Sequence, residues 1–129
     1  MPSAKRTPGK PRRPPPVVRL RLRVSVGEVV AIGPGKVSLL EAVAEHGSIS
    51  AAARSIEMSY RRAWMLLDEL NRSLKRPAIE TAQGGERGGG ARLTPTGEAI
   101  IRHYREAEQV ALAAGRPHLI KLMALMRKA

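Results

Sequence analysis

The chain of 129 residues has no cysteine and no phenylalanine, and its aromatic side chains are limited to one tryptophan and two tyrosines. Without cysteine there is no disulfide and no thiolate nucleophile, so we expect the protein to work in a reducing cytoplasm. A hydrophobic core must be built from aliphatic side chains, and the length suits one domain with one core. No stretch approaches the roughly 20 apolar residues of a membrane helix, so we expect no membrane partner.

Acidic residues are also missing from residues 1–27, which carry eight of the 23 basic side chains. Residues 28–129 hold 15 basic and 11 acidic groups, so the net charge of +12 is concentrated near the N-terminus. A surplus of this size favours a polyanionic partner, first of all nucleic acid. Residues 1–16 are rich in Pro, Lys and Arg and have no apolar face, so we expect a disordered basic tail and not a signal peptide.

Apolar periodicity divides the rest of the chain into elements. Residues 17–26 alternate apolar and basic side chains, which predicts a half-buried strand, and residues 29–33 suggest a second strand. Helical spacing then predicts one helix ending before Gly47, a second capped by Ser48 or Ser50, and a third capped by Ser59 and ended by Pro77. Two short strands around a glycine-rich tip predict a hairpin over residues 78–94. A fourth helix should run from Pro95 to about residue 114, with a break at residues 115–117 before a last short helix.

Three helices followed by a hairpin are the order of a winged helix-turn-helix, a mainly α fold with a small β component. The local spacing agrees, because Ala53 is small where two helices would cross, Glu57 lies in the turn, and Ala63 follows the Ser59 cap by four residues. In such a fold the helix that begins after Ser59 can enter a DNA major groove with its first residues at the base edges. The arginines there can bind guanine and the tyrosine a thymine methyl group.

Two segments carry a resemblance to a known family. GSISAAARSIEMSYRRAWMLLDELN and GGERGGGARLTPTG look like the N-terminal domain of the ModE family of molybdate-responsive transcription regulators, which is related to the LysR-type helix-turn-helix. The resemblance covers about residues 17–114 and implies that the recognition helix includes Tyr60, Arg61, Arg62 and Trp64. It also implies that the helices beyond Thr94 form a dimer interface. The chain departs from the family at Glu57, where a glycine is common and a left-handed backbone would be strained.

The predicted function is therefore a cytoplasmic, homodimeric transcription regulator, a repressor, that binds double-stranded DNA. We expect a basic tail (residues 1–16), a DNA-binding domain (17–94) and dimerisation helices (95–129). The predicted DNA-binding residues are Ser59, Tyr60, Arg61, Arg62, Trp64, Arg87 and Arg92, the last two as contacts of the wing to phosphates. Family members carry molybdate in C-terminal domains, so we expect no cofactor in this chain, which is either a single-domain relative or a fragment.

Other functions remain as alternatives. The same charge would suit a nucleoid-type architectural protein without sequence preference, and the same fold would suit a protein-interaction module. Trp64 could lie in the core instead of on the DNA-binding surface. The segments GPGK (33–36) and GGERGGG (84–90) lack the spacing of a phosphate-binding P-loop. The three histidines lack metal-ligand spacing, and no arrangement of nucleophile, base and acid indicates an enzyme.

Overall fold

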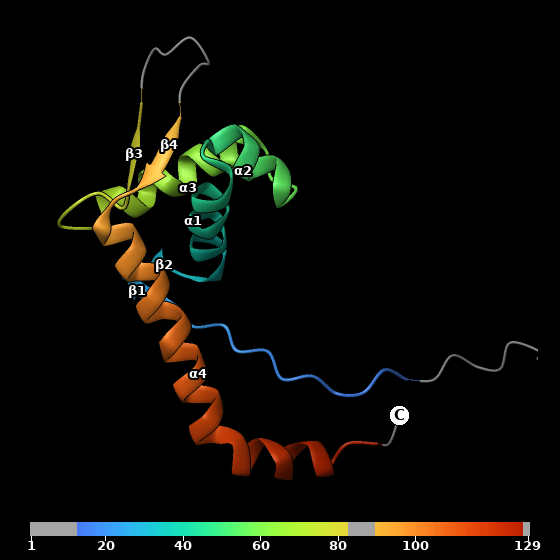
Figure 1. Ribbon diagram of the computed structural model, residues 1–129. Coiled ribbons are helices and arrows are strands. Elements are labelled where there is room, and N and C mark those ends of the chain that lie inside the picture. Colours follow the sequence, from blue (N-terminus) through green and yellow to red (C-terminus); the bar gives the residue numbers. More distant parts are fainter. Residues whose placement is uncertain (1–12, 83–89, 128–129) are drawn as a thin grey trace, which may run out of the picture.

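The computed structural model describes residues 13–82 and 90–127. In chain order the elements are β1 (Val24–Val26), β2 (Val29–Ile32), α1 (Pro34–His46), α2 (Ile49–Ser55), α3 (Tyr60–Arg72), β3 (Ile79–Thr81), β4 (Ala91–Leu93) and α4 (Pro95–Ala124). Helices α1, α2 and α3 lie together, the β3–β4 hairpin extends to one side of them, and α4 runs away in the other direction (Figure 1). The predicted mainly α winged helix-turn-helix is confirmed.

The core is aliphatic, as the composition requires. Helix α1 is central, because it contacts α2, α3, α4 and β4. The five largest fully buried side chains are Leu39, Leu40, Leu70, Val37 and Val43, four of them from α1. Alanines occupy the crossing of α2 and α3, where Ala52, Ala53 and Ala63 are at most 2% exposed. Their small side chains let the two helix backbones approach closely, which explains the alanine run of the sequence.

Side-chain caps begin three of the helices where the sequence places them. The hydroxyl of Ser48 accepts from the amide of Ala51, that of Ser59 from Arg62, and that of Thr94 from Gly97, at 3.1, 3.1 and 3.2 Å. The turn between α2 and α3 contains Glu57 with φ +54°, so the left-handed backbone is present without glycine. Such a conformation strains a residue with a side chain. The backbone amides of Glu57 and Met58 bond to the carbonyls of Arg54 and Ala53, which holds the turn in place.

The predicted strand over residues 17–26 is wrong for most of its length. Only Val24–Val26 pair with β2, and residues 17–23 have no regular structure and are largely exposed. The reason is the absence of a partner, because β2 ends at Ile32 opposite Val24 and the chain then enters α1. Alternating side chains predict a strand only where a neighbouring backbone supplies a ladder.

Two predicted helix ends are also wrong. Helix α3 ends at Arg72, well before Pro77, because the next amides turn to carbonyls only three residues back, Ser73 to Leu70 at 3.0 Å and Leu74 to Asn71 at 3.2 Å. Helix α4 does not end at residues 115–117 but continues through Pro117 to Ala124. A proline inside a helix removes one hydrogen bond and bends the axis without always ending it. Figure 1 shows the last turns of α4, in red, turned away from the axis of the rest.

Candidate nucleic-acid interface

The N-terminal half of α3 is held with its first turn in solvent. Its buried side consists of Ala63, Leu67 and Leu70, which pack into the core. Because successive helical residues are rotated by about 100°, Arg61 lies on the side opposite to these three. Arg61 and Arg62 are both exposed. The helix therefore presents a cationic first turn to any partner that approaches its outer face.

Ser59, Tyr60 and Trp64 have different surroundings. The hydroxyl of Ser59 accepts a bond from the amide of Arg62, so this side chain caps α3 and positions the residues after it. Tyr60 and Trp64 are 56% and 49% exposed, so Trp64 is not a core residue. Both lie on the flank of α3 that Asn71 occupies, three turns after Tyr60 and two turns after Trp64. The side chain of Asn71 bonds to the backbone of Ala78 and Ile79, which places this flank on the side of the wing.

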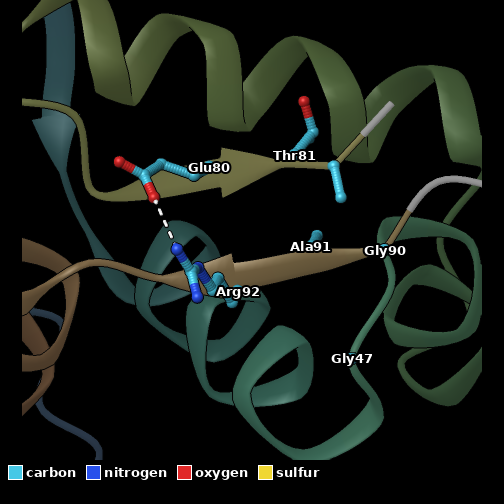
Figure 2. Close-up of a pocket in the computed structure, with 7 residues that line it drawn as sticks. Gly47, Glu80, Thr81, Gly90, Ala91 and Arg92 are labelled. Atoms are coloured by element: carbon cyan, nitrogen blue, oxygen red, sulfur yellow. Dashed lines mark ion pairs between the residues drawn. The ribbon is translucent and has the colours of Figure 1, made fainter. Parts of the chain in front are cut away.

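The wing is the β3–β4 hairpin. Its antiparallel register pairs Ile79 with Leu93, Glu80 with Arg92, and Thr81 with Ala91. The amide of Ala91 donates to the carbonyl of Gly47 at 2.9 Å, which fixes the hairpin against the turn between α1 and α2 (Figure 2). Gly47 supplies the left-handed φ of +74° that ends α1.

Arg92 extends from this hairpin into solvent. Its side chain is 83% exposed and lies 3.6 Å from the carboxylate of Glu80, a surface pair that costs little to open. Arg92 is therefore available for a phosphate contact. Arg87, the other predicted wing residue, lies outside the described residues.

A buried lysine joins α1 to α3 and was missed by the sequence analysis. Lys36 is 5% exposed, and its ammonium group pairs with Glu69 at 2.5 Å and donates to the carbonyl of Val30. The GPGK segment therefore forms the N-cap and the first turn of α1, with its lysine directed to Glu69 and the carbonyl of Val30. The sequence offers little to predict the burial of Lys36, because the only indication is its position beside Val37 in the first turn of α1.

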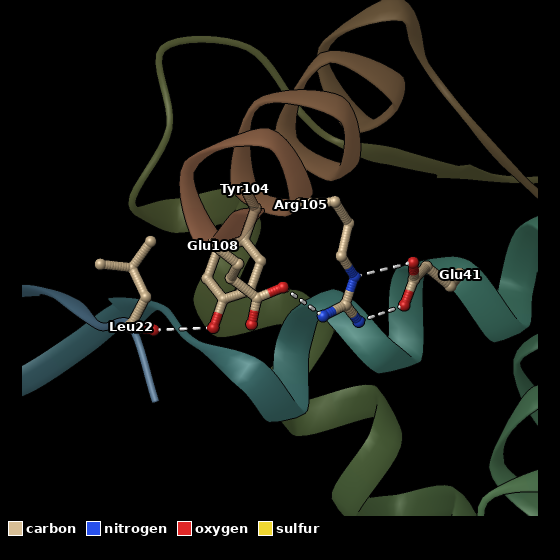
Figure 3. Close-up of polar contacts among 5 residues, drawn as sticks. All are labelled: Leu22, Glu41, Tyr104, Arg105 and Glu108. Atoms are coloured by element: carbon tan, nitrogen blue, oxygen red, sulfur yellow. Dashed lines mark hydrogen bonds and ion pairs between the residues drawn. The ribbon is translucent and has the colours of Figure 1, made fainter. Parts of the chain in front are cut away.

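The first turns of α4 are fixed to the domain by polar contacts (Figure 3). The buried Tyr104 donates its hydroxyl proton to the carbonyl of Leu22 at 2.8 Å. Burial raises the pKa of Tyr104 above its ordinary value of 10, and the carboxylate of Glu108 adds to this shift. Arg105 binds both carboxylate oxygens of Glu41 in α1, at 3.0 and 2.5 Å.

The guanidinium of Arg105 also bonds to Glu108 at 2.7 Å. Its hydrogen bonds, first to Glu41 and then to Glu108, raise the pKa of Arg105 above its ordinary value, so the group stays charged. The predicted dimerisation stripe is therefore divided. Ile100 and Ile101 pack half-buried on the core and Tyr104 is buried, whereas Ala107 and Ala111 are exposed.

Residues 13–82 and 90–127 lack two kinds of feature. Within these ranges, no cluster of three or more His, Asp or Glu side chains is placed to hold a metal ion. No helix in the same part of the chain combines the length and apolar character needed to cross a membrane.

Comparisons with known proteins agree with this geometry. Residues 35–98, from the start of α1 to the start of α4, match the family model of the bacterial regulatory helix-turn-helix proteins of the lysR family. The chain is 44% identical over 73 residues to the molybdenum-pterin-binding protein MopA of Rhodobacter capsulatus, covering 57% of this chain and 28% of that protein. It is 36% identical over 92 residues to the molybdenum transport protein ModE of Azotobacter vinelandii, covering 71% and 33%. For the DNA-binding transcriptional dual regulator ModE of Escherichia coli, the identity is 39% over 77 residues, with coverage of 60% and 29%.

Solved structures show the same fold. A MarR family transcription regulator superposes with a TM-score of 0.54 at 25% identity, over 72% of this chain and 64% of that one. The DNA-binding domain of CbnR, solved with DNA, superposes with a TM-score of 0.52 at 24% identity, over 68% and 95%. The match to MopA and to the ModE proteins spans about a third or less of their length. The chain therefore carries a ModE-like DNA-binding domain of the lysR helix-turn-helix type.

Proposed function

We propose that the protein is a transcription regulator that binds double-stranded DNA in a sequence-specific manner. The observation that carries this proposal is the first turn of α3. It is capped by Ser59, supported from below by Ala63 and Leu67, and presents Arg61 outward. An α-helix with its side chains is about as wide as the major groove, so Arg61 can reach the O6 and N7 atoms of guanine there.

The neighbouring residues support the same contact. Tyr60 offers a hydroxyl and an apolar ring edge to the bases, and Trp64 offers an indole N–H donor to the groove wall on the wing side. Arg92 would contact a phosphate and add affinity without sequence preference. Arg87 has the same proposed role on sequence grounds alone. Recognition requires no chemical step, so we propose no enzymatic activity, and we propose a cytoplasmic location because the proposed target is chromosomal DNA.

We propose that the protein acts as a homodimer through α4. One recognition helix covers only a few base pairs, so regulators of this type generally use two half-sites about one helical turn apart. Beyond Tyr104, α4 leaves a series of large apolar side chains more than a third exposed, namely Val110, Leu112, Ile120 and Leu122. A second α4 would cover those that share a face, such as Leu112 and Leu122, which lie about 80° apart around the helix, and a monomer would leave them in water. Light scattering at micromolar concentration tests this, and a monomeric mass would refute it.

The link to molybdate is proposed from the relatives, whose names refer to molybdenum. Oxyanion binding needs several N–H and hydroxyl groups that converge on a pocket. Residues 95–124 form one continuous helix, whose backbone N–H groups are used within the helix apart from its first turn. We therefore propose that this chain alone represses its targets without binding molybdate. Titration calorimetry with molybdate tests the proposal that this chain does not bind the oxyanion, and a saturable signal would refute it.

The experiment for the main proposal is the selection of an operator from random duplexes, followed by measurement of specific and non-specific affinity at physiological salt. We expect a ratio of about 10³ or more. A ratio near one would support an architectural protein, and the absence of DNA binding would leave the protein-interaction module. Replacing Arg61 with Ala should cost about 1–3 kcal/mol at the operator and relax the preference at one base pair. The matched control is Arg76→Ala, which removes the same charge from an exposed residue beyond the end of α3.

A further inference from the structure

The two adjacent arginines of α3 lie in different surroundings. Arg61 shares its face with Met65 and Asp68, on the outer side of the helix. Arg62 is rotated by about 100° from it and shares a flank with Leu66 and Glu69. These three flank residues line an open pocket together with Gly33 and the first turn of α1, whereas Arg61 does not line it.

Two arginines of the N-terminal segment lie in the same pocket. Arg21 and Arg23 precede β1 and line this pocket together with Arg62. The side chain of Arg23 lies beside Gly33, because a Cβ built on Gly33 would be 3.6 Å from the Cγ of Arg23. The segment that the sequence predicted as a strand thus brings two arginines to the pocket beside the recognition helix.

The charge of this pocket is strongly positive. Its lining includes four cationic side chains and a single carboxylate, that of Glu69. Glu69 is already paired with the buried Lys36. In the part of the chain that the structure describes, no carboxylate lies within 4.0 Å of the guanidinium groups of Arg21, Arg23 or Arg62. Three cations held close together at one flank would repel each other, and an anionic partner relieves this repulsion.

We propose that Arg21, Arg23 and Arg62 form a clamp for the phosphates along one wall of the major groove, and that Arg62 does not read bases. The clamp rests on the proposed DNA-binding function, and it assigns base contacts and phosphate contacts to different arginines of the same site. A helix in the major groove has base edges below it and a phosphate strand on each side. The outer residue Arg61 faces the bases, the wing-side flank faces one strand, and the flank of Arg62 faces the other. Phosphate contacts fix the register of a protein on DNA but carry no sequence information.

The test uses the full chain and its selected operator, with binding measured by fluorescence anisotropy from 50 to 200 mM salt. The variants are Arg62→Ala, the double variant Arg21→Ala/Arg23→Ala, and Arg61→Ala, with Arg76→Ala as a matched charge control. Each phosphate contact contributes about 0.9 to the slope of log affinity against log salt. Removing one contact should therefore reduce the affinity lost over this salt range by ~3.5-fold.

We expect Arg62→Ala and the double variant to weaken binding to the operator and to a scrambled duplex by similar factors, with a shallower salt slope. Arg61→Ala should lower the ratio between the two affinities, and Arg76→Ala should change neither quantity. A loss of preference at one base pair in Arg62→Ala would show that Arg62 reads bases and would overturn the clamp. An unchanged slope in the double variant would overturn it as well. If the parent chain selects no operator, the proposed function itself fails, which is a separate result. Circular dichroism checks that every variant is folded.

Discussion

Gly97, in the first turn of α4, provides a sharp test of how this helix is attached to the wing. A Cβ added to Gly97 would lie 2.2 Å from the carbonyl oxygen of Ala78 and 3.1 Å from its carbonyl carbon. The oxygen belongs to backbone that cannot rotate away as a side chain would. The same oxygen accepts the amide of Thr94 at 3.0 Å, and the hydroxyl of Thr94 donates to the carbonyl of Pro77 at 2.6 Å. Either α4 or residues 77–78 must move by about 1 Å in Gly97→Ala, at the expense of these bonds.

The expected magnitude follows from three contributions. Overpacking of a rigid contact costs about 1–3 kcal/mol. The two weakened hydrogen bonds cost up to about 1 kcal/mol each. Alanine favours a helix over glycine by about 1 kcal/mol, which offsets part of this. We therefore expect Gly97→Ala to lower the free energy of unfolding by about 2–3 kcal/mol.

A control is available in the same helix. A Cβ on Gly115 would meet only the side chain of Leu119, at an ordinary contact distance of 3.7 Å. Gly115→Ala should therefore raise stability by up to about 1 kcal/mol. Urea unfolding followed by circular dichroism, at one fixed protein concentration, measures both variants. If Gly97→Ala is as stable as the parent, the close approach of α4 to residues 77–78 is refuted. A similar loss in both variants would show that the effect does not come from the contact with Ala78.

Three further predictions concern the attachment of α4 and the tail. Tyr104→Phe should cost about 1 kcal/mol at neutral pH through the lost bond to the Leu22 carbonyl. Because the pKa of Tyr104 is raised in the folded state, the difference in the free energy of unfolding between this variant and the parent should be fully present below pH 10. It should shrink as the pH rises through the folded-state pKa. A difference that does not change with pH would contradict this. Arg105→Lys keeps the charge but loses the bidentate bond to Glu41, so the free energy of unfolding in urea should fall by about 1 kcal/mol. No loss would mean that this partly exposed pair contributes nothing to stability. Deleting residues 1–16 removes five positive side chains and should weaken binding to all duplexes with a shallower salt dependence, whereas a fall in the specificity ratio would show that the tail reads sequence.

Features that depend on a few neighbouring residues were predictable. The caps at Ser59 and Thr94 follow from a hydroxyl placed before an apolar periodic run, and both are present. The turn at Glu57 follows from the spacing of the two helices around it, whereas its left-handed backbone was implied only by the resemblance to the ModE family. The hairpin follows from two short strands around a glycine-rich tip, and the strands pair as expected. The outward position of Arg61 follows from helical rotation once the buried residues are known. Its contact with bases remains a prediction.

Features that depend on distant residues were not predictable in the same way. Alternation over residues 17–26 indicated a strand, but strand formation also requires a partner, and β2 is too short to supply one. Proline at position 117 indicated a helix end, although one lost hydrogen bond is small compared with the bonds that continue the helix on both sides.

What the sequence alone determined is the order of elements, the aliphatic core and the cationic first turn of α3, because these depend on local backbone preferences and on the period of apolar residues. Only the tertiary structure decided that Lys36 is buried against Glu69, that Tyr104 reaches the carbonyl of Leu22, and that Arg62 shares a pocket with the N-terminal segment. The members of these groups are separated by tens of residues along the chain. Their proximity depends on how whole elements pack against one another, and local periodicity sets which face of an element is buried but not which other element covers it.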